Sequence, residues 1–214
     1  MALNRESTRE QITQLILERI LDGTYKPGER LIELHIAGEL NTSQAPVREA
    51  LRYLEALRVV ESEPYKGTRV RLISDKELED SSQVRAVLEE LGAQLAAEKL
   101  QGNAASLARL EAEAQSFMQA AHAKDVPLYS QHDIEFHRLI MEASENQVLI
   151  AIWESVVLES RFRLTLKKIG AEQLCQFGAA HLPVLEAIKR GDGKAAGKLL
   201  KSLICKYHFM RSEA

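Results

Sequence analysis

Aromatic residues, cysteines and long apolar runs are all scarce in this chain. Phe, Trp and Tyr make up only 5% of the 214 residues, and the abundance of Ala and Leu favours helices over sheets. Cys175 and Cys205 form no CxxC pair, so we expect a reduced, cytoplasmic protein. No run approaches the ~20 apolar residues of a membrane helix, and the N-terminus has no apolar core of signal length. We therefore expect no membrane partner.

The chain also lacks a large excess of either positive or negative charge. The net charge is −3, with 45% hydrophobic and 28% charged residues, an ordinary soluble balance. This net charge argues against a surface that is basic throughout. It does not argue against a local basic face, because DNA interacts with the charges of the surface it contacts and not with the net charge of the protein. The length fits one large domain or two small ones. The change in pattern near residue 74 predicts two, covering residues 1–74 and 75–214.

Residues 33–52 predict a helix-turn-helix. Apolar residues at helical spacing indicate helices over residues 8–21 and 31–40, and a short polar turn follows the second. Ser43 is placed to cap the next helix with its hydroxyl. Pro46 falls in the first turn of that helix, where a missing N–H costs little. A helix pair of this form is the usual way to place one helix in the DNA major groove.

The helix after Ser43 has an apolar and a polar face. The apolar positions step at i, i+3, i+4 and i+7: Val47, Ala50, Leu51, Leu54 and Leu57. Gln44, Arg48 and Arg52 lie on the other side, and their side chains can reach phosphates or base edges. The alternative is a solvated face on which Arg and Glu residues pair at i, i+4.

The residues that follow favour the DNA-binding interpretation. An apolar pair at 59–60, a turn at 64–67 and alternation over 69–72 predict a small β-hairpin with Lys66 at its tip. A helix-turn-helix followed by a hairpin is a winged helix. Charges within residues 1–74 cancel, so affinity must come from the placement of a few cations. One copy would bind weakly, which favours a homodimer on two-fold operator DNA.

Residues 75–214 read as helical almost throughout. Breaks near residues 102, 126, 145, 170 and 192 predict about six helices in an antiparallel bundle. One helix carries an apolar face made of Val84, Val87, Leu88, Leu91 and Leu95. The next carries another, made of Leu107, Leu110, Ala114, Phe117, Met118 and Ala121. The fold class is therefore mainly α, a winged helix-turn-helix followed by an all-α bundle.

One constellation in the bundle could bind a metal. Asp133 and His137 stand at i, i+4 and point the same way from one helix, and His181 opens another. A carboxylate and two imidazoles suit a divalent ion such as Zn²⁺, Ni²⁺ or Mn²⁺. The alternative is a hydrogen bond on a helix surface without any ion.

The first third of the chain closely resembles the DNA-binding domain of the GntR family of bacterial transcription regulators. The resemblance rests on the KPGERL turn, the SQAPVREALRYLE helix and the KGTRV wing. It implies that DNA is contacted by Ser43, Gln44, Ala45, Pro46, Arg48, Arg52, Lys66, Gly67 and Thr68. Two positions depart from the family pattern, because members usually carry Arg where Gln44 stands and Gly where Arg58 stands. The first departure suggests a different operator.

The remainder looks like the all-helical effector domain of the FadR subfamily, called FCD. The stretches VRAVLEELGAQLAAEKL, DIEFHRLIMEASEN and HLPVLEAIKRGD carry this resemblance. In many such domains an Asp and the matching histidines hold a metal, which implies Asp133, His137 and His181 here. A further His usually sits in the last helix, where we place Leu203, and His208 is off that face. Either three ligands hold the ion, or the pocket binds an organic effector directly.

The resemblance also suggests effector ligands. Arg85 matches an Arg that faces the pocket in some members, and Arg161 and Arg163 could hold a carboxylate. The alternative for each is a surface salt bridge to a neighbouring Glu such as Glu89. The implied function is an effector-responsive regulator, more often a repressor, controlled by a small organic acid. The competing classes are a metal-dependent hydrolase or lyase at Asp133, His137 and His181, and a ligand-independent DNA-architectural protein.

Overall fold

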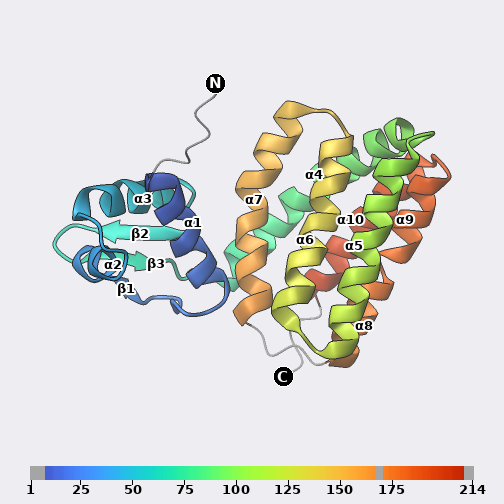
Figure 1. Ribbon diagram of the computed structural model, residues 1–214. Coiled ribbons are helices and arrows are strands. Elements are labelled where there is room, and N and C mark those ends of the chain that lie inside the picture. The colour runs from blue at the N-terminus through green and yellow to red at the C-terminus, as the bar shows by residue number, and fades with distance from the viewer. Residues whose placement is uncertain (1–7, 167–170, 210–214) are drawn as a thin grey trace. The chain divides into compact units, whose positions relative to one another are not determined.

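The computed structural model describes the backbone of residues 8–166 and 171–209, with the side chains of residues 8–157 and 172–206. The chain divides into two compact units, Met1–Ser74 and Asp75–Ala214, and each is described by itself (Figure 1). The fold class predicted from the sequence is confirmed: a small winged helix-turn-helix and an all-helical bundle. Among the described helices, none combines the length and the apolarity that a bilayer span requires.

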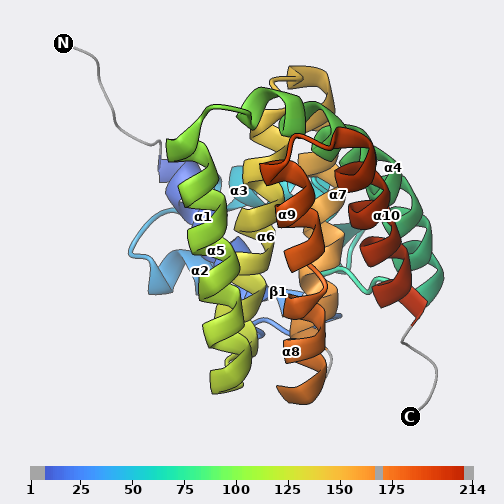
Figure 2. The same cartoon turned by 90° about the vertical axis from the view of Figure 1, so that its right-hand side faces the viewer.

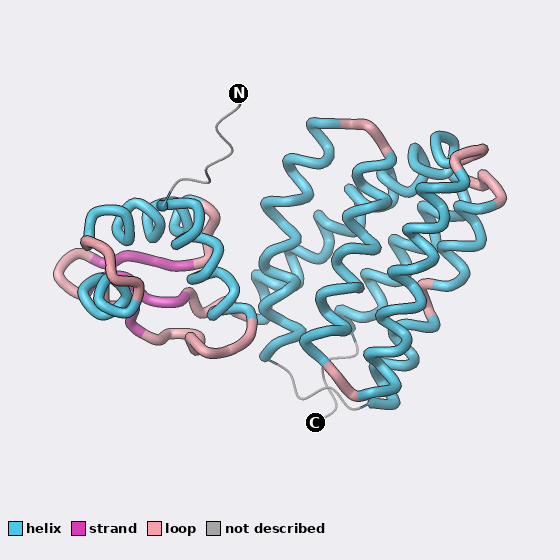
Figure 3. Tube along the Cα trace, viewed as in Figure 1, coloured by secondary structure: helices cyan, strands magenta, loops and turns pink. Residues whose placement is uncertain are grey.

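The first unit packs three helices on a three-stranded antiparallel sheet. Its elements are α1 (Thr8–Leu21), β1 (Arg30–Leu31), α2 (Glu33–Glu39), α3 (Gln44–Ala56), β2 (Val60–Glu63) and β3 (Gly67–Val70). The strand order is β1-β3-β2, as Figure 3 shows in magenta. The predicted hairpin is therefore confirmed, but the sequence missed β1. Leu31 pairs with Thr68 in that strand, so the helix predicted from residue 31 begins only at Glu33.

The core of this unit forms where the apolar face of α3 meets α1 and the sheet. Val47, Ala50 and Leu54 are each 0% exposed, which confirms the predicted apolar face of this helix. The α3 helix ends in a Schellman motif, because Arg58 N–H donates to Glu55 O and Val59 N–H donates to Leu54 O. Arg58 itself has a φ of 59°. This left-handed conformation is the one that glycine adopts most easily.

The second unit is a bundle built around one long helix. Its elements are α4 (Asp75–Leu100), α5 (Ala104–Ala123), α6 (Val126–Ala143), α7 (Gln147–Leu166), α8 (Ala171–Ala179), α9 (Leu182–Lys189) and α10 (Gly193–Phe209). The described part of this unit thus holds seven helices instead of about six, because α8 and α9 are separate (Figure 2). The core is lined by Phe117, Phe136 and Leu200, together with the alanines of α4 and α5.

The α4 helix buries a different face from the one with the largest apolar side chains. Its buried positions are mostly small or polar, such as Ala93, Ala96 and Ala97, which allows α10 to pack closely along it. Val84, Val87 and Leu91, by contrast, are 49%, 58% and 43% exposed. Of the apolar face predicted there, these three side chains stay open to solvent within their own unit, whereas Leu88 packs against the cluster around Trp153.

Candidate functional site

The candidate DNA surface is the solvent side of α3. Because Val47, Ala50 and Leu54 face inward, Ser43, Gln44, Ala45, Arg48 and Arg52 are left exposed, while Pro46 is half-buried. Ser43 is the N-cap residue of α3, as expected, and its backbone is extended with φ −84° and ψ 164°. The expected hydrogen bond from its hydroxyl is absent, because the side chain makes no capping contact. The hydroxyl therefore stays available at the helix N-terminus.

The two arginines of this face differ in their surroundings. Arg48 forms a fork with the Glu33 carboxylate on α2: its Nη2 lies 2.7 Å and its Nε 3.1 Å from Glu33 Oε2. Arg52 makes no hydrogen bond or ion pair with another described residue. The i,i+4 ladder of the alternative interpretation is thus not what restrains Arg48. Glu33 holds the guanidinium in place, and DNA must compete with that carboxylate.

The wing brings its cations next to acids as well. Lys66 is exposed at the tip between β2 and β3, and its Nζ lies 2.6 Å from a Glu63 carboxylate oxygen. Arg69 on β3 also pairs with Glu63. Gly67 is exposed and Thr68 half-buried, and Thr68 Oγ1 lies 3.0 Å from Ser62 Oγ. Sequence reasoning named the cations but not Glu33 and Glu63, whose proximity depends on the tertiary fold.

The second candidate site is a buried group that we call the Asp-His-His cluster, made of Asp133, His137 and His181. Both α6 residues come from one helix face, and His181 stands at the N-cap of α9. The three side chains are buried, and their ligand atoms all lie within 4.8 Å of one another. His137 Nε2 is 3.1 Å from His181 Nε2, and His181 Nε2 is 3.3 Å from Asp133 Oδ1. The fold therefore brings together the three residues that the sequence singled out.

The Nδ1 atom of each histidine ring already has a partner outside the cluster. His181 Nδ1 lies 2.8 Å from the carbonyl oxygen of Phe177, which can only accept, so this nitrogen carries a proton. His137 Nδ1 contacts the Glu89 carboxylate, which also accepts. Burial lowers the pKa of His181 to about 4, although the Asp133 carboxylate acts in the opposite direction. His181 is therefore neutral at pH 7, and its Nε2 presents a lone pair to the cluster.

This arrangement suits a cation. When each ring carries a single proton, on Nδ1, two nitrogen lone pairs and a carboxylate oxygen converge on one small volume. No proton would then lie between the acceptors, so they would repel one another without a positive charge among them. Two imidazoles bound to one divalent ion at about 2.0–2.1 Å place their nitrogens roughly 3–3.4 Å apart. The 3.1 Å between the two Nε2 atoms falls within that range.

Glu89 completes the surroundings, and sequence reasoning missed its role. Its side chain is 0% exposed and pairs with Arg85 and His137. Burial by itself raises the pKa of the Glu89 carboxyl, but the Arg85 guanidinium and the His137 ring lower it to about 2. The alternative suggested for Arg85, a surface salt bridge with Glu89, was wrong about location: the pair exists but is buried. The i,i+4 spacing could have predicted the pair, but not its depth.

The structure describes the side chain at one of the remaining positions that the resemblance singled out, and not at the others. Leu203 is 7% exposed and belongs to the same apolar core as Phe117 and Phe136, whose rings pack against His181. The side chains of Arg161, Arg163 and His208 lie outside the described residues.

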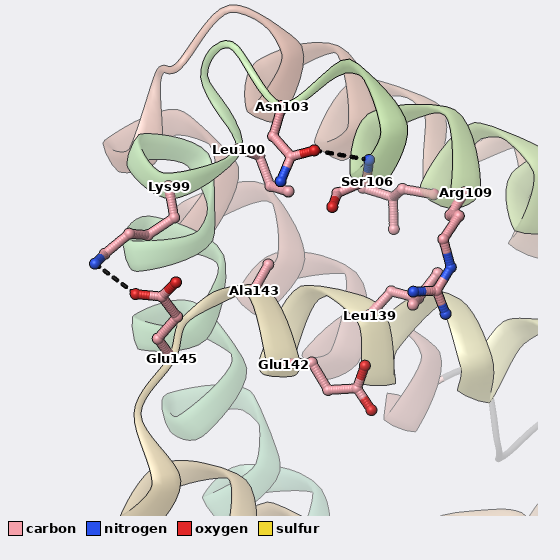
Figure 4. A pocket seen from close by; sticks show the side chains of 10 residues that line it. Lys99, Leu100, Asn103, Ser106, Arg109, Leu139, Glu142, Ala143 and Glu145 are labelled. Atoms are coloured by element: carbon pink, nitrogen blue, oxygen red, sulfur yellow. Dashed lines mark hydrogen bonds and ion pairs between the residues drawn. The ribbon is translucent and has the colours of Figure 1, made fainter.

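A separate surface pocket of about 220 Å³ lies between α4, α5 and α6. Figure 4 shows Arg109 and Glu142 among the side chains that line it. No residue of the Asp-His-His cluster lines it.

Comparison with known proteins decides the family. The model of the FCD domain matches residues 80–205, and the model described as bacterial regulatory proteins, gntR family, matches residues 8–70. The chain belongs to the gntR family of bacterial regulators. GntR proteins are DNA-binding transcription regulators and not enzymes, and no comparison supports the enzymatic or architectural alternatives. The FCD domains of some GntR regulators bind metals.

Individual relatives agree with this assignment. A probable D-xylose utilization operon transcriptional repressor of Paenarthrobacter nicotinovorans is 30% identical, over 96% of this chain and 89% of its own length. The galactonate operon transcriptional repressor of Escherichia coli (strain K12) is 26% identical, over 95% of each chain. Among solved structures, E. coli McbR/YncC has the same fold, with a TM-score of 0.84 and 23% identity over 95% of this chain and 96% of its own.

Proposed function

We propose that this protein is a cytoplasmic, homodimeric repressor that binds operator DNA and responds to a small hydroxy-carboxylate. On this proposal residues 1–74 are the DNA-binding domain and residues 75–214 the effector-binding and dimerisation domain. The convergence of three buried side-chain atoms of metal-ligand type in the Asp-His-His cluster carries the effector half of the proposal. GntR relatives named for galactonate and gluconate operons support sugar acids as the effector class.

The DNA half rests on the exposed face of α3 and on the wing. Arg48, Arg52 and Lys66 are the cations there, joined by Ser43, Gln44, Ala45, Pro46, Gly67 and Thr68. Arg48 and Arg52 carry the phosphate or guanine contacts, because a guanidinium matches both geometries. Gln44 favours adenine, because its amide can make two hydrogen bonds to that base. Operator DNA must displace Glu33 from Arg48 and Glu63 from Lys66. Binding is expected to weaken as the salt concentration rises, because each phosphate contact releases condensed counterions from the DNA.

Arg48→Ala tests the DNA half. Fluorescence anisotropy with the protein's own promoter DNA, at fixed salt, should show about a tenfold or larger loss of affinity, the cost of one bidentate contact. Zn²⁺ binding should not change. Arg109→Ala removes the same charge from an exposed position on α5 and is the matched control. Equal operator affinity for Arg48→Ala and the native chain would overturn the assignment of the reading helix.

The effector half assigns a divalent ion to the Asp-His-His cluster. Asp133, His137 and His181 would hold it, with Zn²⁺, Ni²⁺ and Mn²⁺ as candidates by ligand type. Such an ion supplies positive charge for the carboxylate and hydroxyl oxygens of a sugar acid. Arg85, and Arg161 and Arg163 of α7, are the proposed partners for the rest of the effector. The response requires that the effector favour one of the protein's states, since equal binding to all states shifts nothing.

Dimerisation is assigned to the exposed apolar face of α4. Val84, Val87 and Leu91 step at i, i+3 and i+7 and stay open to solvent within their unit. Because the charges of residues 1–74 cancel, one DNA-binding unit alone would bind weakly, and a second copy of this chain supplies the second one. A second copy is also the occupant that presents the same apolar stripe in return, as a two-fold interface requires.

A further inference from the structure

Glu89 is the most completely enclosed charged side chain among the described residues, at 0% exposure. It stands on α4, and its partners come from three helices. Arg85 lies one turn earlier on α4, His137 is on α6, and Trp153 is on α7. A buried carboxylate is costly unless it is paired and hydrogen-bonded. The fold therefore commits three helices to holding this one group.

The partners fix both oxygens of the carboxylate. Oε1 accepts hydrogen bonds from Arg85 Nε and from Trp153 Nε1, the latter at 2.7 Å. Oε2 then faces His137 Nδ1. With Oε1 held from two sides, the carboxylate cannot turn its second oxygen away from the ring. The proton of His137 is kept on Nδ1, and Nε2 faces His181.

We propose that Glu89 is the positioning residue of the Asp-His-His cluster: it fixes the His137 ring and tautomer so that Nε2 can bind a metal ion. The proposal rests on the proposed metal-binding function and adds to it a residue outside the ligand set. It also assigns a consequence to Trp153. That indole is one hydrogen bond from the carboxylate that orients a ligand, and it is the single tryptophan of the chain. Metal binding at His137 should therefore change its fluorescence.

Glu89→Gln tests this role with Zn²⁺ as the probe. The amide keeps the shape of the side chain but loses its charge, and a ligand-orienting partner of this kind is worth about 10- to 100-fold in metal affinity. Calorimetric titration should show a loss of that size. The fluorescence change of Trp153 on zinc addition should shrink or vanish at the same zinc occupancy.

Glu90→Gln is the matched control. Glu90 is the next residue on α4 and pairs with Lys201 on α10 at 2.7 Å, outside the cluster. The Glu90→Gln variant should bind zinc with the affinity of the native chain. Trp153→Phe, which removes one donor to Glu89 but keeps an aromatic ring, should weaken zinc binding by a smaller factor. The Trp153→Phe variant also tests the proposal if the Glu89→Gln variant does not fold. Native zinc affinity in both Glu89→Gln and Trp153→Phe would overturn the proposal.

A measurement on the zinc-free native chain distinguishes the positioning role of Glu89 from the proposed metal-binding function. Imidazole ¹⁵N shifts, recorded near pH 7, should show His137 protonated on Nδ1 with Nε2 unprotonated, and a mixture of tautomers in Glu89→Gln. If the native chain binds no zinc but His137 has this tautomer, the metal proposal fails while the positioning role stands. A proton on Nε2 and none on Nδ1 in the native chain would contradict the positioning role.

Discussion

Arg58 ends α3 in a left-handed conformation, with a φ of 59°. Glycine adopts this conformation most easily, which agrees with the Gly that the resemblance to the GntR family leads us to expect at this position. An L-residue with a side chain pays roughly 1–2 kcal/mol for it. The departure therefore leaves the helix exit in place and adds a cation at an energetic cost.

Arg58→Gly is expected to stabilise the DNA-binding unit. The relief of strain exceeds the entropy that glycine adds to the unfolded chain, for a net gain of about 0.5–1 kcal/mol. Slower hydrogen exchange of the α3 amides would register this gain. Faster exchange of those amides in the variant would show that the Arg58 side chain contributes more than its backbone costs.

The buried His181 is expected to make the stability of the metal-free protein depend on pH. Its pKa is about 4 in the folded state because of burial, and near 6.5 in the unfolded chain. Between these values the unfolded chain binds more protons, so the free energy of unfolding must fall as the pH falls from about 6.5 to 4. Urea unfolding followed by Trp153 fluorescence measures it. His181→Asn should flatten the slope, and an unchanged slope would count against this pKa.

At the scale of elements, the packing of α10 along α4 depends on small residues. A Cβ placed on Gly197 would lie 2.6 Å from the backbone oxygen of Glu90, and a backbone atom cannot swing aside. The two helices approach too closely there for any side chain.

Gly197→Ala is therefore expected to destabilise the helical unit by about 1–3 kcal/mol, the usual cost of overpacking. Urea unfolding monitored at Trp153 gives the value. Ser202→Ala, at an exposed position of the same helix, should be neutral or slightly stabilising. A Gly197→Ala variant as stable as the native chain would mean that α4 and α10 can separate at no cost.

The elements also show what the sequence could and could not predict. Helical periodicity located the apolar face of α3 and the Asp133–His137 pair, because both depend on spacing within one helix. The strand β1 was missed, since two residues carry no periodicity and Leu31 continues the apolar pattern of α2. Glu33 beside Arg48, and Trp153 beside Glu89, lie 15 and 64 positions apart. Only tertiary structure brings such pairs together.

At the scale of the whole molecule, the exposed stripe of α4 bears on assembly. Val87→Glu would place a charge within the apolar stripe of the proposed two-fold interface. Sedimentation at micromolar concentration should then show monomers in place of dimers, with weaker operator binding. Leu128→Glu, at a 40% exposed position of α6, should remain dimeric. A dimeric Val87→Glu protein would move the interface elsewhere.

We propose that the Asp-His-His cluster of this regulator is a metal site. Elemental analysis of protein purified without a metal-chelating tag or column shows whether the site carries an ion. We expect about one divalent ion per chain for a site with three protein ligands, and its loss in a double variant that combines His137→Ala with His181→Ala. A folded native chain that carries no metal, and takes up none from micromolar Zn²⁺, Ni²⁺ or Mn²⁺, would contradict it.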